Sequence, residues 1–253
     1  MLVGNYLEQA EIKELVASFE GKLKFQNLIR EMQYHEGFVF AENTIEMIQA
    51  MKFDVVKNEA VISAKVLYFK VSENVKIRYI IRHVNGDKET TNDFFIGELT
   101  RPSEEGDGFT ITHFKSRNDT FVSSFESHLS EEAIALGAEG DKKSEEEFPF
   151  DEHYYPGMLL NDEVRAEKKW YQGCLPGGYI WCGDDCGGSA SCTSSVKGVN
   201  GLDNCCKAHD CCYSKNKVSY PNCYCDQRLC DCSQAAPFAF NKAIVETAMC
   251  FVC

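Results

Sequence analysis

The stretch LDNCCKAHDCCY, residues 202–213, places a histidine and an aspartate side by side among four cysteines. Imidazole is the side chain best suited to move a proton near neutral pH, and carboxylate oxygens are ligands that hard divalent cations prefer. The run from Cys205 to Lys215 contains neither Gly nor Pro, and Asp203 or Asn204 can cap a helix there. The pattern therefore predicts a helix that holds the histidine and the aspartate at fixed positions.

On such a helix, side chains three or four residues apart are neighbours. His209 then lies beside Cys206 and Tyr213, whereas Asp210 points about 100° around the axis. Cysteines seven residues apart share one face and can tie the helix to a partner element. A histidine and an aspartate on a helix fixed in this way meet the positional demands of catalysis.

The cysteines are confined to one part of the chain. All 14 lie between Cys174 and Cys253, and none precedes them. A density of roughly one residue in six is typical of a disulfide scaffold formed in an oxidising compartment, and the even count fits full pairing. The sequence alone leaves the connectivity open.

Three interpretations of the motif compete. In the first, His209 and cysteine thiolates form a closed tetrahedral zinc site, although the spacing lacks a pair of CxxC knuckles. In the second, His209 is an ordinary polar residue on a disulfide-bound helix. In the third, His209 activates water in a calcium-assisted hydrolase, because ester hydrolysis needs a base that works near neutral pH.

Three segments favour the third interpretation through a family resemblance. DNCCKAHDCCY (203–213) resembles the active-site helix of the secreted phospholipase A2 superfamily, D-x-C-C-x-x-H-D-x-C-Y. YIWCGDDCGG (179–188) resembles the calcium loop of that family, and CYCDQRLCDC (223–232) is similar to the second helix of its insect-venom branch. The motifs cover residues 174 to about 232. The resemblance implies a small disulfide-rich all-α domain with two linked helices.

The resemblance also assigns catalytic roles. It implies calcium-dependent hydrolysis of the sn-2 ester of glycerophospholipids, with His209 taking the proton from the attacking water. Asp226 would accept the other ring N–H and fix the tautomer, as a carboxylate does in serine hydrolases. Tyr213 would hydrogen-bond Asp226. The partner implied is a phospholipid membrane surface.

The implied metal ligands for Ca²⁺ are the carboxylate of Asp210 and the backbone carbonyls of Trp181, Gly183 and Asp185. Asp185 departs from the family pattern, which has a glycine there. If the position needs a positive φ, aspartate adopts it less easily than glycine. The alternatives are that an aspartate of this loop adds a carboxylate, or that Gly187 replaces the missing glycine after a shift.

The same resemblance implies a set of disulfides: Cys182–Cys206, Cys205–Cys232, Cys212–Cys225, and Cys223 with Cys250 or Cys253. Two cysteines are additional to the family pattern. Cys211 and Cys230 are expected to pair with each other or with Cys174, Cys186 or Cys192.

The cysteine-free region predicts a different architecture. Apolar residues recur at helical spacing over residues 9–33, with a break near Gly21, and Thr44 can cap a second short helix over residues 45–51. Four strand-like segments follow: AVISAKVLYFKVS, VKIRYIIRHV, DFFIGEL and GFTITHFKS. The first two suit a hairpin, and VNGDKE offers a turn. Residues 121–129 form another strand or a short helix.

Three regions result from this pattern. Residues 1–136 form an α+β domain with an antiparallel sheet, whose role the sequence does not reveal. Residues 137–169 form an acidic linker, because GAEGDKKSEEE at its start is small and charged. Residues 170–253 form the cysteine-rich domain. Five residues beside the loop offer either a rim for an acyl chain or packing beneath the loop: Leu175, Pro176, Tyr179, Ile180 and Trp181.

Charge and composition limit the partners. The net charge is −13, and residues 170–253 carry six Lys/Arg against seven Asp/Glu, so nearly all the negative charge precedes them. An acidic chain without a basic run is a poor candidate for binding nucleic acid. The chain contains no run of about 18 apolar residues, so the sequence predicts no membrane span. The disulfides predict secretion, although residues 1–15 lack the pattern of a signal peptide.

A second functional interpretation explains this conflict. Precursors of cysteine-rich, halocin-like antibacterial peptides have a long cysteine-free N-terminal region that acts as a leader or an immunity domain. The division of the chain at Cys174 suits such a precursor. On this interpretation the first region is an intramolecular pro or immunity domain for a secreted peptide.

Overall fold

The structure, a computed structural model, describes residues 1–57, 59–104, 106–167, 173–183, 186–219, 221–237 and 240–250. Its centre is a seven-stranded antiparallel sheet in which each strand pairs with its neighbours in the sequence. The strands are β1 (Leu2–Tyr6), β2 (Glu46–Lys57), β3 (Ala60–Ser72), β4 (Val75–Val84), β5 (Asp87–Pro102), β6 (Phe109–Ser116) and β7 (Val122–Leu129). The expected antiparallel sheet is confirmed.

Turn chemistry fixes the register of the central hairpins. β3 and β4 form the predicted pair, and Asn85 and Gly86 both have positive φ, 51° and 71°, between β4 and β5. Two successive residues with positive φ are the requirement of the tight hairpin turn that matches the twist of the strands. The Asn85 carboxamide also accepts a hydrogen bond from the Val61 backbone N–H at 2.8 Å, which ties the turn to β3.

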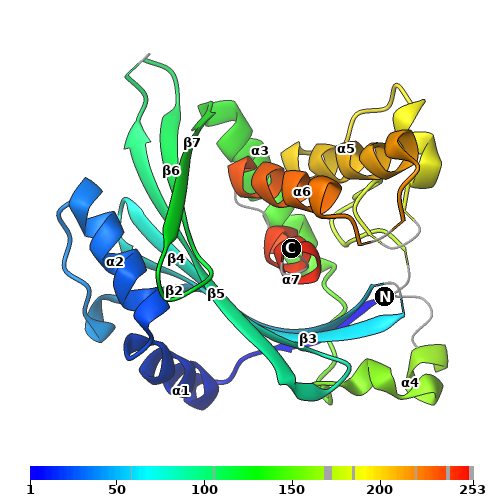
Figure 1. Cartoon of the computed structure of the whole chain (residues 1–253), viewed down its shortest axis with the longest axis horizontal. Coiled ribbons are helices and arrows are strands. Elements are labelled where there is room, and N and C mark those ends of the chain that lie inside the picture. The colour runs from blue at the N-terminus through cyan, green and yellow to red at the C-terminus, as the bar shows by residue number, and fades with distance from the viewer. Residues whose placement is uncertain are drawn as a thin grey trace.

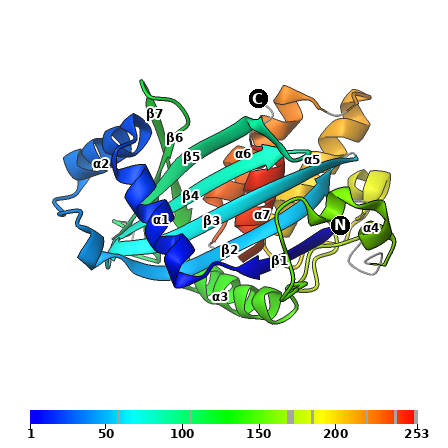
Figure 2. The same ribbon diagram turned by 90° about the horizontal axis from the view of Figure 1, so that it is seen from below.

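Both faces of this sheet are buried. Along β3, Val66 belongs to one hydrophobic cluster and Leu67 to another, as period-two alternation requires. The Leu67 face packs against α1 (Gln9–Glu20) and α2 (Leu23–His35), whereas the Val66 face packs against α7 (Phe240–Met249) (Figures 1 and 2). The predicted break near Gly21 is confirmed, because Gly21 lies between α1 and α2.

Three N-terminal expectations need correction or completion. The prediction of a helix over residues 45–51 is wrong, because these residues lead into and form β2. Their pairing with β1 and β3 overrides the helix-capping signal of Thr44. β1 was not expected at all. Residues 121–129 contain β7, which resolves the two alternatives in favour of a strand.

Part of the expected acidic linker is a helix. Residues 137–146 belong to α3 (Glu131–Glu146), whose N-cap is Ser130. The Ser130 hydroxyl accepts a hydrogen bond from the Ala133 backbone N–H at 3.2 Å, and two glutamates in the first turn complement the helix dipole. Composition alone hid this helix, because most of its charged residues face solvent, while Ser144 packs inward and half-buried Asp141 accepts a hydrogen bond from the Phe240 N–H of α7. A short helix, α4 (Asp162–Glu167), follows.

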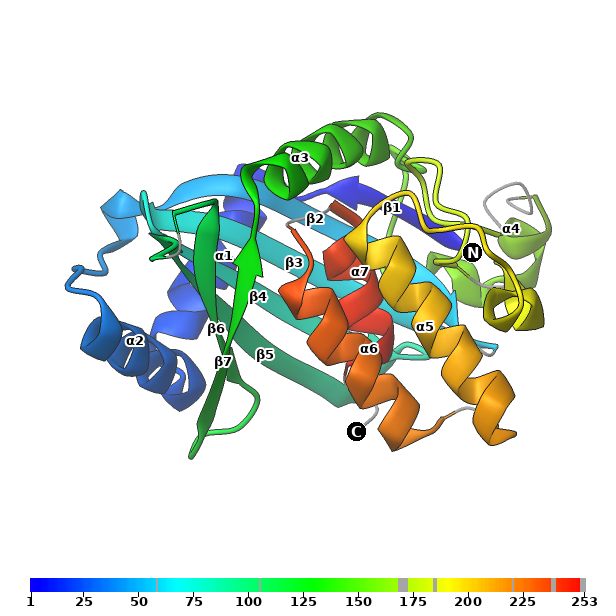
Figure 3. The same ribbon diagram turned by 90° about the horizontal axis from the view of Figure 1, so that it is seen from above.

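The C-terminal part is helical and cross-linked. It contains α5 (Gly201–Asn216), α6 (Cys223–Ala235) and α7, with six disulfides among the described residues. Figure 3 shows α5 and α6 lying side by side above the sheet, with α7 between α6 and the strands. Within the described ranges, none of the helices combines the length and hydrophobicity that a bilayer crossing requires.

Candidate functional site

The first motif helix begins earlier than expected. Neither Asp203 nor Asn204 caps α5; the N-cap is Asn200, whose side-chain oxygen accepts a hydrogen bond from the Asp203 N–H at 2.9 Å. The helix therefore includes the whole DNCCKAHDCCY segment. Its C-terminal cap, Lys217, has a φ of 51°, which ends the helix in a left-handed turn. Because Asp203 does not cap the helix, its side chain can make another contact, described below.

The three residues expected to act in catalysis meet between α5 and α6. His209 Nε2 lies 2.9 Å from Asp226 Oδ1, and the Tyr213 hydroxyl donates to the same oxygen at 2.8 Å. His209 and Asp226 are both buried. The rings of His209 and Tyr213 pack edge to face with centroids 4.9 Å apart. One carboxylate thus receives hydrogen bonds from two side chains that lie one turn apart on α5.

This contact fixes the tautomer of His209. A carboxylate only accepts hydrogen bonds, so Nε2 carries the proton and Nδ1 keeps its lone pair. Nδ1 lies 3.6 Å from Asp210 Oδ1, beyond hydrogen-bonding distance. Burial lowers the pKa of His209, but the neighbouring carboxylates of Asp210 and Asp226 raise it more, and the net pKa lies above the ordinary 6.5. His209 is therefore a stronger base than a free histidine.

The Asp226 carboxylate is itself held at the start of α6. Asn222 caps this helix by accepting a hydrogen bond from the Cys225 N–H at 3.2 Å. The Asn222 backbone N–H lies within hydrogen-bonding distance of Asp226 Oδ2, 3.1 Å, and of the Tyr213 oxygen, 2.8 Å. Both oxygens of Asp226 are thus engaged, and the residue has little freedom to leave the histidine.

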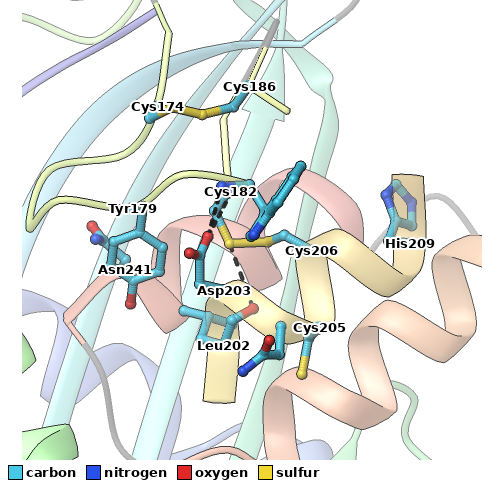
Figure 4. Close-up of a disulfide and its surroundings, with 12 residues drawn as sticks. Cys174, Tyr179, Cys182, Cys186, Leu202, Asp203, Cys205, Cys206, His209 and Asn241 are labelled. Carbon is cyan, nitrogen blue, oxygen red and sulfur yellow. Dashed lines mark hydrogen bonds between the residues drawn. A yellow bond between two sulfur atoms is a disulfide. The ribbon is translucent and has the colours of Figure 1, made fainter. Parts of the chain in front are cut away.

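Asp203 organises the loop that precedes α5. Its buried carboxylate accepts hydrogen bonds from successive backbone N–H groups of the loop, those of Ile180 (3.2 Å), Trp181 (2.9 Å) and Cys182 (3.0 Å). The Val199 N–H adds a fourth at 3.0 Å. Figure 4 shows the Asp203 carboxylate directed at Cys182, beside the disulfide to Cys206.

This arrangement determines which way the loop carbonyls face. In a planar trans peptide the C=O points opposite to the N–H of the same unit. The N–H of Cys182 points at Asp203, so the carbonyl of Trp181 points away from that carboxylate. The loop therefore presents the Trp181 carbonyl, one of the implied calcium ligands, away from the core of the helix pair. Gly183 has a φ of 135°, which only glycine adopts readily.

The other implied metal ligands differ in what the structure shows of them. Asp210 Oδ2 is buried and has no hydrogen-bond partner among the described residues. Burial raises the pKa of Asp210 above 3.8, against the lowering effects of His209 and Lys57. The Gly183 carbonyl makes one long contact with the Cys186 N–H, 3.4 Å. Asp185 lies outside the described residues. An unsatisfied buried carboxylate oxygen beside a glycine-bearing loop suits a hard cation.

The disulfides agree with most of the expected pairs. Cys182–Cys206, Cys205–Cys232 and Cys212–Cys225 are present, and Cys192–Cys211 and Cys174–Cys186 complete the loop region. The Cys223–Cys250 pair is wrong, because α7 carries Cys250 to Cys230 instead. Cys223 is disulfide-bonded, and its other expected partner, Cys253, lies outside the described residues. Cys230–Cys250 was not among the alternatives, since no motif places α7 relative to the other helices.

Oxidation of the cysteines removes the zinc interpretation for this region. Every cysteine that the structure describes is disulfide-bonded, and a disulfide sulfur is no longer the thiolate that zinc requires. Across the described ranges, no cluster of three or more His, Cys, Asp or Glu side chains has the geometry of a metal site. That search concerns side chains alone, whereas the implied calcium ligands are mainly backbone carbonyls.

A cleft of about 270 Å³ opens beside His209 and Asp210. Its walls are mixed in character, with Lys57 and Glu147 among the polar contributors, and the apolar ones come mostly from the loop, from α6 and from α7: Leu175, Pro176, Trp181, Leu229, Ile244, Val245, Ala248 and Met249. Sequence reasoning missed two further contributors. Leu2 of β1 and residues 55–57 of β2 also line the cleft, and no local pattern links them to the cysteine motifs.

Among the residues expected to form either an acyl-chain rim or packing beneath the loop, Tyr179 and Trp181 are buried, and Leu175, Pro176 and Ile180 are half-buried. Tyr179 and Trp181 belong to the main hydrophobic cluster, and Leu175 and Ile180 pack against it. The Tyr179 hydroxyl accepts a hydrogen bond from the Asn200 amide at 2.9 Å. The segment therefore packs against the hydrophobic cluster, while Leu175, Pro176 and Trp181 also line the cleft.

A scan of the chain against protein-family models, and searches against curated proteins and solved structures, return no match. The geometry of the site and the local motifs are therefore the grounds on which function is inferred.

Proposed function

We propose that this protein is a calcium-dependent phospholipase A2-like hydrolase that cleaves the sn-2 ester of glycerophospholipids. The observation that supports this most is the His209–Asp226 pair at 2.9 Å beside a cleft that has apolar side chains from α6 and α7 in its walls. A buried imidazole with a fixed tautomer and a raised pKa is suited to general-base catalysis. A merely structural histidine has no need of a second side chain, Tyr213, on the same carboxylate.

In the proposed reaction, His209 Nδ1 accepts a proton from a water molecule while the water oxygen bonds to the ester carbonyl carbon. Nε2–H continues to donate to Asp226, so the carboxylate stabilises the imidazolium as it forms. When the tetrahedral species collapses, the ester C–O bond breaks and the imidazolium returns its proton to the alcohol oxygen. The products are a fatty acid and a lysophospholipid, and His209 is neutral again.

The residues that would hold Ca²⁺ are Asp210 and the backbone carbonyls of Trp181, Gly183 and Asp185. When bound, the ion would stabilise the negative charge that develops on the ester oxygen. Asp203 positions the loop for this task by holding three of its N–H groups. The unsatisfied Oδ2 of Asp210 is the feature of this chain that favours the assignment.

The substrate class follows from the cleft walls. Leu229, Ile244 and Met249 offer an apolar surface to an acyl chain, whereas His209 and Asp210 provide polar groups at one side. A phospholipid surface is therefore the proposed partner. We also propose secretion, because six disulfides form and persist in an oxidising compartment.

Fatty-acid release from a short-chain, monomeric phosphatidylcholine by the separated C-terminal part of the chain tests the proposal, with calcium and with a chelator. A monomeric substrate avoids the separate step of binding to a lipid surface. Release should require calcium and should be lost in His209→Gln with the fold intact by circular dichroism. Undiminished release in either case contradicts the mechanism. A fragment that kills bacteria without releasing fatty acid would favour the halocin-like interpretation instead.

A further inference from the structure

We propose that the α7-facing side of the seven-stranded sheet is an inhibitory docking surface, called the dock below. The dock binds α7 and thereby holds β1 and β2 over the cleft at His209. The disulfide-rich module is then latent, and breaking the chain between the two parts does not by itself release it. The inhibitory part of this inference rests on the proposed hydrolase function. The docking part stands on the contacts alone.

The dock holds a helix that has no exposed face. All ten residues of α7 are buried, and its apolar side chains join those of the strands in one cluster. Strand residues on this face, such as Val66, Ile80 and Ile96, contact the same cluster. Figures 1 and 3 show α7 enclosed between the sheet and α6. Without the sheet, the apolar side of α7 would face water.

Charged groups make the contact between the sheet and α7 specific. Arg78 Nη1 of β4 lies 2.8 Å from Glu246 Oε2 of α7, and Lys242 Nζ of α7 lies 3.2 Å from Glu98 Oε1 of β5. The Tyr68 hydroxyl donates to Glu98 Oε2 at 3.0 Å. All five side chains are buried. Lys242 and Glu246 are four residues apart and so lie on one face of α7.

Backbone contacts extend this network along the helix. Arg82 donates to the Thr247 carbonyl at 2.8 Å, and Arg117 donates to the carbonyl of Cys250 at 2.5 Å. Arg82 of β4 and Arg117, which directly follows β6, thus bind carbonyls at the C-terminal end of α7, where a positive charge also complements the helix dipole. Buried charges that lose their partners are costly, so the sheet and α7 separate only with difficulty.

A disulfide links α7 covalently to the helix pair that carries His209 and Asp226. Cys230 of α6 is bonded to Cys250, which directly follows α7. Cys205–Cys232 in turn joins α5 to α6. The helix that the sheet holds is thus covalently part of the module that carries His209. A cut in the chain before Cys174 leaves these links intact.

While the dock holds α7, strands of the sheet form one wall of the cleft at His209. Leu2 and Val55 face one another in the β1–β2 register and line the cleft with Val56 and Lys57. The cleft that remains beside these strand residues has a volume of about 270 Å³, at the lower end of the roughly 300–1,000 Å³ typical of ligand pockets, so the strands leave little room for a two-chain phospholipid. Lys57 also brings positive charge near Asp210, where a cation would otherwise be favoured.

The test begins with the dock, which needs no activity. A specific protease sequence is inserted between Glu167 and Gly173 of the full chain, and the cut protein is studied without reductant. The two fragments should co-elute in gel filtration. Arg78→Met leaves Glu246 buried without its partner and should weaken association at least about 100-fold, the factor that corresponds to roughly 3 kcal/mol. Glu11→Gln is the matched control.

Glu11 pairs with Lys52 and Lys65 on the opposite side of the sheet, so its variant should associate like the unchanged protein. If Arg78→Met fails to fold, Arg82→Met removes the hydrogen bond to the Thr247 carbonyl of α7 and should weaken association severalfold. Unchanged fragments that separate freely, or arginine variants that associate as tightly as Glu11→Gln, would overturn the dock.

The second measurement is access to His209, again without activity. An α-bromoketone alkylates imidazole, and peptide mapping gives the rate at His209 relative to the exposed His153. The cut but associated protein should react as slowly as the uncut chain, whereas the separated Arg78→Met module should react severalfold faster. Leu2→Ala with Val55→Ala should raise the rate in the uncut chain. Equal rates in all forms would refute the closed cleft.

Hydrolysis of phosphatidylcholine vesicles separates the two proposals. The separated module should release fatty acid and the associated one should not. If the first two measurements succeed but the separated module is inactive on vesicles and on monomeric substrate, the hydrolase assignment fails and the dock stands. If the uncut chain hydrolyses vesicles as fast as the separated module, the inhibition is refuted and the hydrolase stands.

Discussion

The loop before α5 depends on one buried carboxylate, and Asp203→Asn tests that dependence. Asp203 Oδ1 accepts hydrogen bonds from the N–H groups of Trp181 and Cys182, and Oδ2 accepts from Ile180 and Val199. An asparagine has the same shape but only one accepting oxygen. Its NH₂ group would face two backbone donors in place of an acceptor.

The magnitude follows from these four contacts. With the amide oxygen on the Oδ1 side, two N–H groups lose their partner and meet another donor. An unsatisfied buried donor costs about 1–3 kcal/mol. Both lost contacts are partly buried, so the variant should lose about 2–4 kcal/mol of unfolding free energy. For a chain of this size that is a fall in Tm of about 4–16 °C.

Thermal unfolding without reductant, followed by circular dichroism, measures this loss. Asp231→Asn is the matched control, because Asp231 is an exposed helical aspartate whose partner is Gln227 on the same helix. The control should change stability by less than about 0.5 kcal/mol. If Asp203→Asn is as stable as Asp231→Asn, the loop is held by its disulfides and the argument about the Asp203 carboxylate is wrong.

The remaining predictions concern catalysis and cross-linking. Because the pKa of His209 is raised and the base must be neutral, kcat/KM should rise with pH through a midpoint above 6.5. Asp210→Asn removes a carboxylate that raises this pKa, so it should lower the midpoint measured by NMR titration of the imidazole. The same raised pKa contributes stability that is present below pH 6.5 and is lost as pH rises through the folded-state pKa, as denaturant titrations at several pH values should show. Tyr213→Phe removes one donor to the orienting carboxylate and should lower kcat about fivefold, measured with saturating substrate. Joint replacement of Cys205 and Cys232 by serine should cost about 2–5 kcal/mol in urea unfolding, since it removes one of the disulfides that join the two motif helices and leaves Cys212–Cys225 in place.

Much of the sheet was predictable because its signals are local. The helical periodicity before Gly21, the alternation along β3 and the Asn85–Gly86 turn each specify structure over a few residues. The failures have a non-local cause. β2 was taken in part for a helix because its pairing with β1 and β3 is invisible to a local cap signal at Thr44.

The site divides in the same way. His209, Tyr213 and Asp226 were expected from the family resemblance of the motifs, and the structure brings them together because one disulfide-linked helix pair carries all three. The loop role of Asp203 and the contribution of β1 and β2 to the cleft depend on tertiary packing, which no spacing encodes. Cys250 was misassigned for that reason, since its partner is set by where the sheet holds α7.

The most direct test of the central claim is fatty-acid release by the separated C-terminal module, unchanged and with His209→Gln, from monomeric phosphatidylcholine in calcium. General-base catalysis contributes roughly 10²–10⁴ to a rate, so the variant should lose at least about 100-fold in kcat while it keeps its disulfides and helices. Equal turnover by the two proteins, or turnover that a chelator leaves unchanged, would contradict the account.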